Sequence, residues 1–247
     1  DTLRQSTGFT LFRRQGSRTA NPTTQGASIR GVNSSGASRS SIRFDDVPIN
    51  DPFGGWVVWS RVPRIALERI DVLRGGSSSL YGSGSIGGTV DLITRRAEKR
   101  YDFSIELSGG TANTFDGSAF VGFEQDGWST SLVVSTYQTK GYRIVDSASR
   151  GIVDDFANSH NTNFLLNASR EIGKDSRFYG KASVFGEARN NGTPLQKTRS
   201  HIRNFSAAVD FGFGTLREDA ANTRLVMRVF GGTQLFDQTF SAVSGDR

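Results

Sequence analysis

Few residues of this chain could carry out catalysis, and none of them stands at a catalytic spacing. The sequence has no cysteine and two histidines, His160 and His201, which form no H-x-x-x-H pair. A thiolate metal site is excluded, and a histidine-based metal site or triad is poorly supplied. We expect both histidines to lie at the surface near strand ends. With no nucleophile–base pair or metal cluster, the sequence predicts neither an enzyme nor a bound cofactor.

A glycine motif is the remaining pattern that could bind a cofactor. Gly82, Gly84 and Gly87 match the G-x-G-x-x-G spacing of a dinucleotide-binding loop. That loop needs a strand before it and a helix after it. Here residues 77–81 predict a helical turn, and residues 89–94 are β-branched and predict a strand. The glycines are therefore expected to allow tight backbone turns.

Positive charge is concentrated in the first part of the chain. The formal net charge is +6, and residues 1–98 contain 13 Arg and no Lys against 8 acidic residues. Such a balance suits nucleic acid, an anionic ligand or an acidic internal partner. The region contains no basic helix and no run of interleaved aromatic and lysine residues. Nucleic acid is therefore not an expected partner.

The first region, residues 1–98, is irregular and rich in turns. The end of a helix is expected at residues 1–6, and short strands are expected at 26–31, 41–47, 69–73 and 89–94. Residues 63–68 predict a short helix, in which Pro63 near the start loses no hydrogen bond. Together these elements predict a small α+β domain.

The second region, residues 99–247, consists of long segments in which apolar and polar side chains alternate. Phe103, Ile105 and Leu107, for example, share one face of a predicted strand. We predict seven such segments of about 9–13 residues, the length with which a tilted strand crosses a bilayer. A soluble antiparallel sandwich also alternates, but its strands average about 5–6 residues. The pattern favours a transmembrane β-barrel.

The predicted strands are joined alternately by short and long connections. Residues 125–127 and 173–175 predict tight turns, whereas 140–161 and 188–200 predict long polar loops, as in outer-membrane barrels. Residues 214–222 are longer than a tight turn. A barrel that encloses a domain has about 22 strands, so these seven would form part of one, and more strands are expected after Arg247. No apolar run approaches the length of a spanning helix.

Residues 28–95 contain four sequence blocks in a fixed order. They are Ser28-Ile29-Arg30-Gly31, Phe44-Asp45-Asp46-Val47-Pro48-Ile49-Asn50-Asp51-Pro52, Pro63-Arg64-Ile65-Ala66-Leu67-Glu68-Arg69-Ile70-Asp71-Val72-Leu73-Arg74-Gly75 and Ser79-Leu80-Tyr81-Gly82-Ser83-Gly84-Ser85-Ile86-Gly87-Gly88-Thr89-Val90-Asp91-Leu92-Ile93-Thr94. In order and spacing these blocks closely resemble the plug domain of TonB-dependent outer-membrane receptors. Asp46 replaces the usual glycine before Val-Pro, and Gly76 stands where proline usually follows Arg-Gly; both are turn-type changes.

The resemblance implies a plug domain at residues 1–98 followed at 99–247 by the first strands of a barrel in the outer membrane of a Gram-negative-type bacterium. It also implies energy-coupled uptake of a scarce ligand such as a ferric siderophore, cobalamin or an oligosaccharide. The TonB-binding box, the first plug strand and a signal peptide are expected before Asp1. A signalling receptor shares this architecture and stays an alternative. A passive porin is less consistent with residues 28–95, because porins have no plug domain.

The resemblance further implies two groups of site residues. Arg30 and Arg74 would pair with barrel glutamates on later strands, or locally with Glu68 or Asp71. The outward-pointing plug loops would contact the ligand. Alternatively, Trp56 and Trp59 would belong to the plug core or seal it against the wall. The arginines of the first loop would equally be explained as solvated loop residues. The predicted ligand-contact residues are Arg13, Arg18, Asn21, Asn50, Asp51, Phe53, Trp56 and Trp59.

Overall fold

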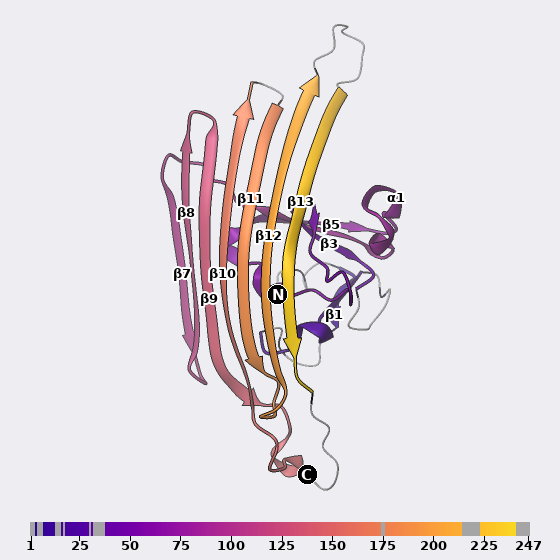
Figure 1. Cartoon of the computed structure of the whole chain (residues 1–247), viewed down its shortest axis with the longest axis vertical. Helices are drawn as coiled ribbons and strands as arrows, with labels where there is room; N and C mark the ends of the chain where they lie inside the picture. Colours follow the sequence, from indigo (N-terminus) through magenta and orange to yellow (C-terminus); the bar gives the residue numbers. More distant parts are fainter. Residues whose placement is uncertain are drawn as a thin grey trace.

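The computed structural model describes residues 3, 7–12, 16, 18–29, 31, 38–173, 176–213 and 223–240. The expected helix end at residues 1–6 lies almost wholly outside these ranges. The described chain forms a plug with two small sheets and a wall with one seven-stranded sheet. Figure 1 shows the plug at mid-height against one face of the much taller wall.

The main plug sheet has four strands in the order β4-β3-β6-β5. They are β3 (Ser41–Phe44), β4 (Val47–Pro48), β5 (Leu67–Arg74) and β6 (Gly88–Thr94). The β3–β6 pair is parallel, and the β3–β4 and β5–β6 pairs are antiparallel. A smaller sheet pairs β1 (Phe9–Phe12) with β2 (Gly26–Ile29). The pattern of the sequence did not predict β1.

Short helical turns connect the plug strands. They are η2 (Pro22–Thr24), η3 (Trp59–Arg61), η4 (Arg64–Ala66), α1 (Ser78–Tyr81) and η5 (Ser83–Ser85). The helix predicted at 63–68 is therefore only a 3-10 turn. It ends early because Leu67 already pairs with Thr94 at the start of β5. A residue that joins a sheet ladder has its backbone groups satisfied there.

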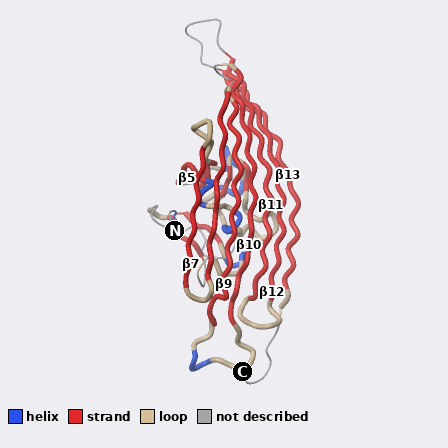
Figure 2. Tube along the Cα trace, turned by 90° about the vertical axis from the view of Figure 1, so that its left-hand side faces the viewer, coloured by secondary structure: helices blue, strands red, loops and turns tan. Residues whose placement is uncertain are grey.

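The wall is a seven-stranded antiparallel sheet in which each strand pairs with its neighbour in the chain. Its strands run side by side in Figure 2. Five of them have 15–17 residues, more than the predicted 9–13, because the ladder continues into segments whose polar side chains predicted loops. The strands are β7 (Asp102–Gly110), β8 (Thr114–Gln125), β9 (Trp128–Arg143), β10 (Phe156–Ile172), β11 (Ser176–Asn190), β12 (Lys197–Phe213) and β13 (Thr223–Gln238).

The connections at the two ends of the wall differ in length. Residues 126–127 close a tight turn at one end, and the turn predicted at 173–175 lies mostly outside the described residues. At the other end, residues 144–155, which include η6 (Ser147–Ser149), and residues 191–196 form longer loops. These loops are shorter than the predicted 140–161 and 188–200, since their flanks belong to strands. The β12–β13 connection at 214–222 lies outside the described residues.

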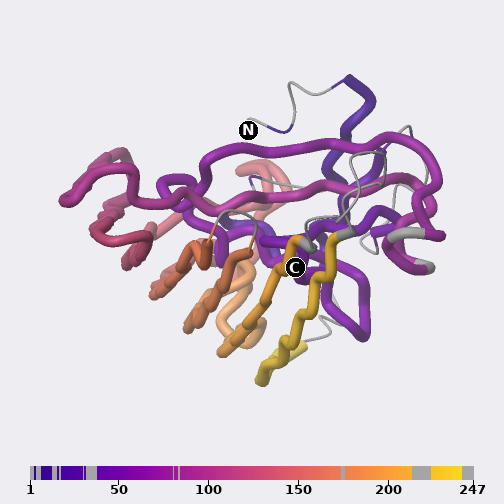
Figure 3. Tube along the Cα trace, turned by 90° about the horizontal axis from the view of Figure 1, so that it is seen from above, coloured from indigo at the N-terminus to yellow at the C-terminus, as the bar shows by residue number. Residues whose placement is uncertain are grey.

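The two faces of the wall have opposite environments. Phe103, Leu166 and Phe205 point away from the plug and are 49–64% exposed. Phe120, Val133 and Leu165 point toward the plug and join one apolar core with the plug residues Ile42, Ile65, Val90 and Leu92. Figure 3 shows the plug lying along this inner face. Exposed apolar side chains occur on the outer face of every wall strand, as expected of a surface that contacts lipid.

No helix among the described residues is both long enough and apolar enough to span a membrane.

Candidate functional site at the contact between plug and wall

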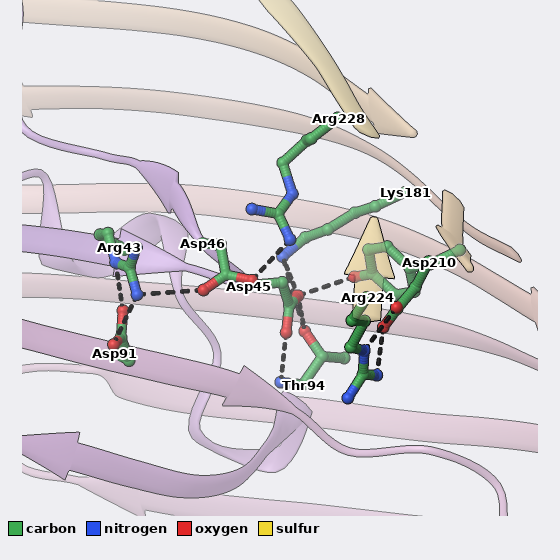
Figure 4. A network of polar contacts seen from close by, with 10 residues as sticks. Arg43, Asp45, Asp46, Asp91, Thr94, Lys181, Asp210, Arg224 and Arg228 are labelled. Carbon is green, nitrogen blue, oxygen red and sulfur yellow. Dashed lines mark hydrogen bonds and ion pairs between the residues drawn. The ribbon is translucent and has the colours of Figure 1, made fainter. Parts of the chain in front are cut away.

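The β3–β4 hairpin carries the central polar contact between plug and wall. Its two turn residues, Asp45 and Asp46, have positive φ angles of 49° and 64°. A two-residue hairpin whose central residues both have positive φ matches the right-handed twist of the strands, and aspartate tolerates this conformation better than most residues. The tight turn therefore presents two adjacent carboxylates to the wall (Figure 4).

Asp45 is held by donors from the wall and from the plug. Its Oδ2 accepts hydrogen bonds from Lys181 Nζ and Tyr179 Oη, each at 2.7 Å, and from the Thr94 hydroxyl. Its Oδ1 accepts the Thr94 amide at 2.8 Å. The Asp45 and Lys181 side chains are only 14% and 8% exposed. Lys181 also lies over the Phe44 ring.

The protonation of Asp45 reflects two opposing effects. Burial alone would raise the pKa of this carboxyl, because it disfavours the charged form. The Lys181 ammonium and the hydrogen bonds from Lys181 and Thr94 outweigh burial and lower the pKa below its ordinary value. Asp45 is therefore ionised at neutral pH, and the buried contact is a true ion pair.

Asp46 links the plug sheet to a different wall strand. Its Oδ2 accepts from Arg228 Nη2 of β13 at 2.5 Å, and its Oδ1 accepts from Arg43 Nη2 at 3.0 Å. Arg43 also binds Asp91 with two hydrogen bonds of 2.5 and 2.7 Å and stacks on Tyr81. Burial alone would lower the pKa of Arg43, but Asp91 and Asp46 raise it. Asp91–Arg43–Asp46–Arg228 is thus a continuous chain of charges (Figure 4).

A second polar contact lies nearer the long-loop end. Glu187 and Arg189 of β11 form an ion pair whose side chains are almost completely buried. Ser60 donates to Glu187 at 3.0 Å, and Arg189 donates to the carbonyl of Ala20. Asn163 of β10 donates to the Ser60 carbonyl at 2.8 Å. Because both charges have partners, burial of the pair is tolerated.

Between these two contacts lies a small cavity of about 50 Å³, whose lining is largely apolar but includes several polar side chains. Arg61 and Lys181 line it together with Asn163 and Asn204. Burial lowers the pKa of Arg61 to about 10, although nearby Asp51 opposes this shift. A polar cavity needs about 10–15 Å³ for each water it holds. The plug and wall are thus separated here by a space that a few waters could fill.

Three plug arginines contact the first strands of the wall. Arg18 pairs with Asp116 at 2.5 Å and stacks on Tyr137. Arg64 pairs with Glu106 at 3.2 Å, and Arg95 with Asp102 at 2.8 Å. Here the plug supplies the cation and the wall the anion, as the excess of plug arginine suggested. At the β3–β4 hairpin the plug instead supplies the anions and the wall the cations.

Several predicted ligand-contact residues have structural partners. Asn50 accepts from the Ile42 amide at 2.7 Å and donates to the Ser40 carbonyl at 3.1 Å. The Asp51 carboxylate accepts hydrogen bonds from the backbone amides of Phe53 and Gly54 and from the side-chain amide of Gln234 in β13. Both residues therefore shape the loop that carries Phe53, whose side chain is 95% exposed.

The remaining predicted residues fall into three groups. Trp56 packs against Phe236 and the wall cluster of Phe185 and Ile202, and Trp59 packs against the main core. Asn21 caps η2 by accepting from the Thr23 amide. Arg13 and Arg30 lie outside the described residues.

The predicted plug–barrel residues Arg74 and Glu68 are both exposed on β5. Glu68 pairs with Arg69, which also pairs with Asp71 at 3.1 Å. The local partner of these two acids is therefore Arg69. Whether Arg30 and Arg74 pair with later wall strands stays a prediction.

Sequence reasoning did not single out Asp45, Lys181, Arg228, Glu187 or Arg189. One signal was visible, because Asp46 departs from the expected glycine at a turn. Lys181 and Arg228 stand on the polar face of their strands. Their pairing with the hairpin depends on where the plug lies against the wall. The alternation of polar and apolar residues along a strand carries no information about that position.

Together the fold and this interface define a class of protein, namely a plug domain seated on the inner face of a membrane β-barrel wall. Residues 1–89 match the family model described as TonB-dependent Receptor Plug Domain. This part of the chain is thus a plug domain of the TonB-dependent receptor family, and seven antiparallel wall strands follow it.

Individual relatives agree with this family. Over 54 residues, or 22% of this chain, it is 43% identical to an iron-regulated outer membrane virulence protein of Vibrio cholerae. Over 127 residues, or 50% of the chain, it is 29% identical to the vitamin B12 transporter BtuB of Vibrio vulnificus. The solved FrpB iron transporter of Neisseria meningitidis superposes with a TM-score of 0.69 over 94% of this chain at 12% identity. The chain spans 8%, 20% and 36% of these proteins, respectively.

Proposed function

We propose that this chain supplies the plug and the first wall strands of a receptor that takes up a scarce ligand across the outer membrane in a TonB-coupled manner. The observation that carries the proposal is the buried Asp45–Lys181 ion pair, which seats the plug on the inner face of the wall. A plug seated in this way closes a passage until it is moved. The family implies that the force comes from TonB.

We also propose the domain limits. Residues 1–98 would be the plug and residues 99–247 the wall. The change of sheet between β6, which ends at Thr94, and β7, which begins at Asp102, supports this division. Arg30 and Arg74 would contact acids on further wall strands, and Glu68 would be a further contact between plug and barrel.

The ligand class that the relatives favour is a metal chelate, either a ferric siderophore or cobalamin. The loop at residues 50–57 lies near the long-loop end of the wall, because Asp51 binds Gln234 and Trp56 packs on Phe236 near the end of β13. Phe53 is exposed at its tip, and an aromatic ring offers a large contact area at a low cost in side-chain entropy. We propose Phe53 as a ligand contact and keep Arg13 and Arg18 as two further candidates.

Growth of a receptor-deletion strain tests the proposal. The strain should lose growth on one ferric chelate, cobalamin or oligosaccharide supplied as the limiting source, and the intact receptor should restore growth only when TonB is present. Phe53→Ala should raise the required ligand concentration. Ile86→Ala, at another exposed apolar residue, should not. Equal growth with and without TonB would contradict energy-coupled uptake.

A further inference from the structure

One wall strand carries a row of basic side chains on its outer face. In β12, Lys197, Arg199, His201 and Arg203 are exposed, whereas the intervening Thr198, Ser200 and Ile202 are at most 2% exposed because they face the plug. Alternate residues of a strand lie about 7 Å apart. The row therefore extends for about 20 Å along the outside of the wall.

The same face of the same strand becomes apolar toward the short-turn end. Phe205 and Phe211 point outward and are 56% and 39% exposed. The basic row begins at Lys197, directly after the loop at residues 191–196. If the outward apolar residues contact acyl chains, the basic row lies at the level of the lipid headgroups on the long-loop side.

The surroundings leave these cations available. Arg199 lies opposite Ala188 of β11 and Asp237 of β13, and His201 lies opposite Gly186 and Leu235. Among the described residues, no ion pair involves Lys197, Arg199 or Arg203. Asp237 therefore faces Arg199, whereas the described partners opposite Lys197 and Arg203 are the uncharged Asn190, Val184 and Thr233. The His201 ring lies beside Gly186, because a Cβ added there would be 3.7 Å from its Nδ1.

We propose that this row, Lys197, Arg199, His201 and Arg203, binds the phosphate groups of a lipid in the outer leaflet of the membrane. Arginine suits phosphate because its planar guanidinium donates two parallel hydrogen bonds. The apolar continuation of β12 places acyl chains directly beside the headgroup. The inference rests on the proposed placement of the wall in the outer membrane, and it adds a lipid as a specific ligand.

The test uses the purified full receptor in phosphatidylcholine nanodiscs containing diphosphoryl lipid A. Native mass spectrometry and a binding titration compare the unmodified receptor with Arg199→Gln/Arg203→Gln. The matched control is Arg170→Gln, an exposed arginine on the outer face that stacks on Trp128 at the opposite end of the wall. We expect the double variant to bind lipid A at least about tenfold more weakly, and the control to bind it unchanged.

Two further arms separate the sources of phosphate. Dephosphorylated lipid A should bind the unmodified receptor as weakly as the double variant binds lipid A, and millimolar inorganic phosphate should not displace the lipid. Equal retention by the variant, equal binding of dephosphorylated lipid, or displacement by free phosphate would each overturn the proposal. Heat-modifiable migration verifies that every variant is folded. Ligand-dependent growth reports separately on the proposed transport.

Discussion

Lys181 on the wall and Asp45 in the plug form a buried ion pair, with Lys181 Nζ 2.7 Å from Asp45 Oδ2. The next residue of the same turn, Asp46, pairs with Arg228 two strands away in the sheet. A single two-residue turn thus binds β11 and β13 at once. The hairpin is therefore a short, rigid connection between plug and wall, and its parts can be tested separately.

Loss of one partner of the buried pair should weaken the seating of the plug. Lys181→Met leaves the Asp45 carboxylate without its cation, and breaking a buried pair in this way costs about 3–5 kcal/mol. The free energy of plug unfolding, measured by urea titration of the intact receptor, should fall by that amount. Asp45→Asn/Lys181→Met should recover part of the loss. A Lys181→Met receptor within 0.5 kcal/mol of the parent, about the size of ordinary surface effects, would contradict the assignment.

The same pair predicts how plug stability depends on pH. The folded-state pKa of Asp45 is lowered, so its contribution is fully present above the ordinary aspartate pKa of about 3.9 and is lost as the pH falls through the lower, folded-state value. The urea midpoint of plug unfolding should therefore fall below about pH 4. Asp45→Asn should show a smaller fall. An identical acid profile in both proteins would exclude Asp45 as the group responsible.

Asp46 combines an unfavourable backbone conformation with a favourable charge contact. Asp46→Gly relieves the positive φ but removes the bonds to Arg43 and Arg228, and half-exposed pairs are worth about 0.2–1 kcal/mol. The two effects should nearly cancel. Asp46→Ala loses the bonds and keeps the strain, so it should destabilise the plug by about 1–2 kcal/mol. Comparing the urea midpoints of both variants checks this order; equal losses would refute it.

Gly88 should be the least replaceable glycine of the β5–β6 contact. Its φ is +136°, and an added Cβ would lie 2.4 Å from the Leu73 carbonyl oxygen. Gly88→Ala should therefore disrupt the β5–β6 pairing and cost more than about 3 kcal/mol. Gly84→Ala is the matched control, because a Cβ there meets nothing within 4 Å. Limited proteolysis of the plug should separate the two variants clearly.

On the outer face of β10, the energetic cost of an introduced arginine should depend on its depth in the membrane. Leu166→Arg places a charge within the apolar band and should cost about 2–4 kcal/mol, whereas His160→Arg, nearer the long-loop end of the same face, should cost about 0–1 kcal/mol. The yield of folded, heat-modifiable barrel measures both. Similar yields would show that this face is not exposed to lipid.

Alternation and turn residues were enough to predict the seven wall strands and the α+β nature of the plug, whereas the family was inferred from the resemblance of the blocks within residues 28–95. These features are local, because a period of two along the chain sets which side chains share a face. The ends of the strands were predicted less accurately from the sequence. The polar segments that flank residues 144–155 extend β9 and β10, because backbone hydrogen bonding between strands does not require apolar side chains.

Only the tertiary structure decided which charges meet. Asp45 and Lys181 are 136 residues apart, and nothing in either local sequence names the other. Their contact depends on the position of the plug against the wall, which many weak apolar contacts determine together. The sequence by itself therefore determined the elements and their faces, whereas the packing of those faces selected the partners of each charge.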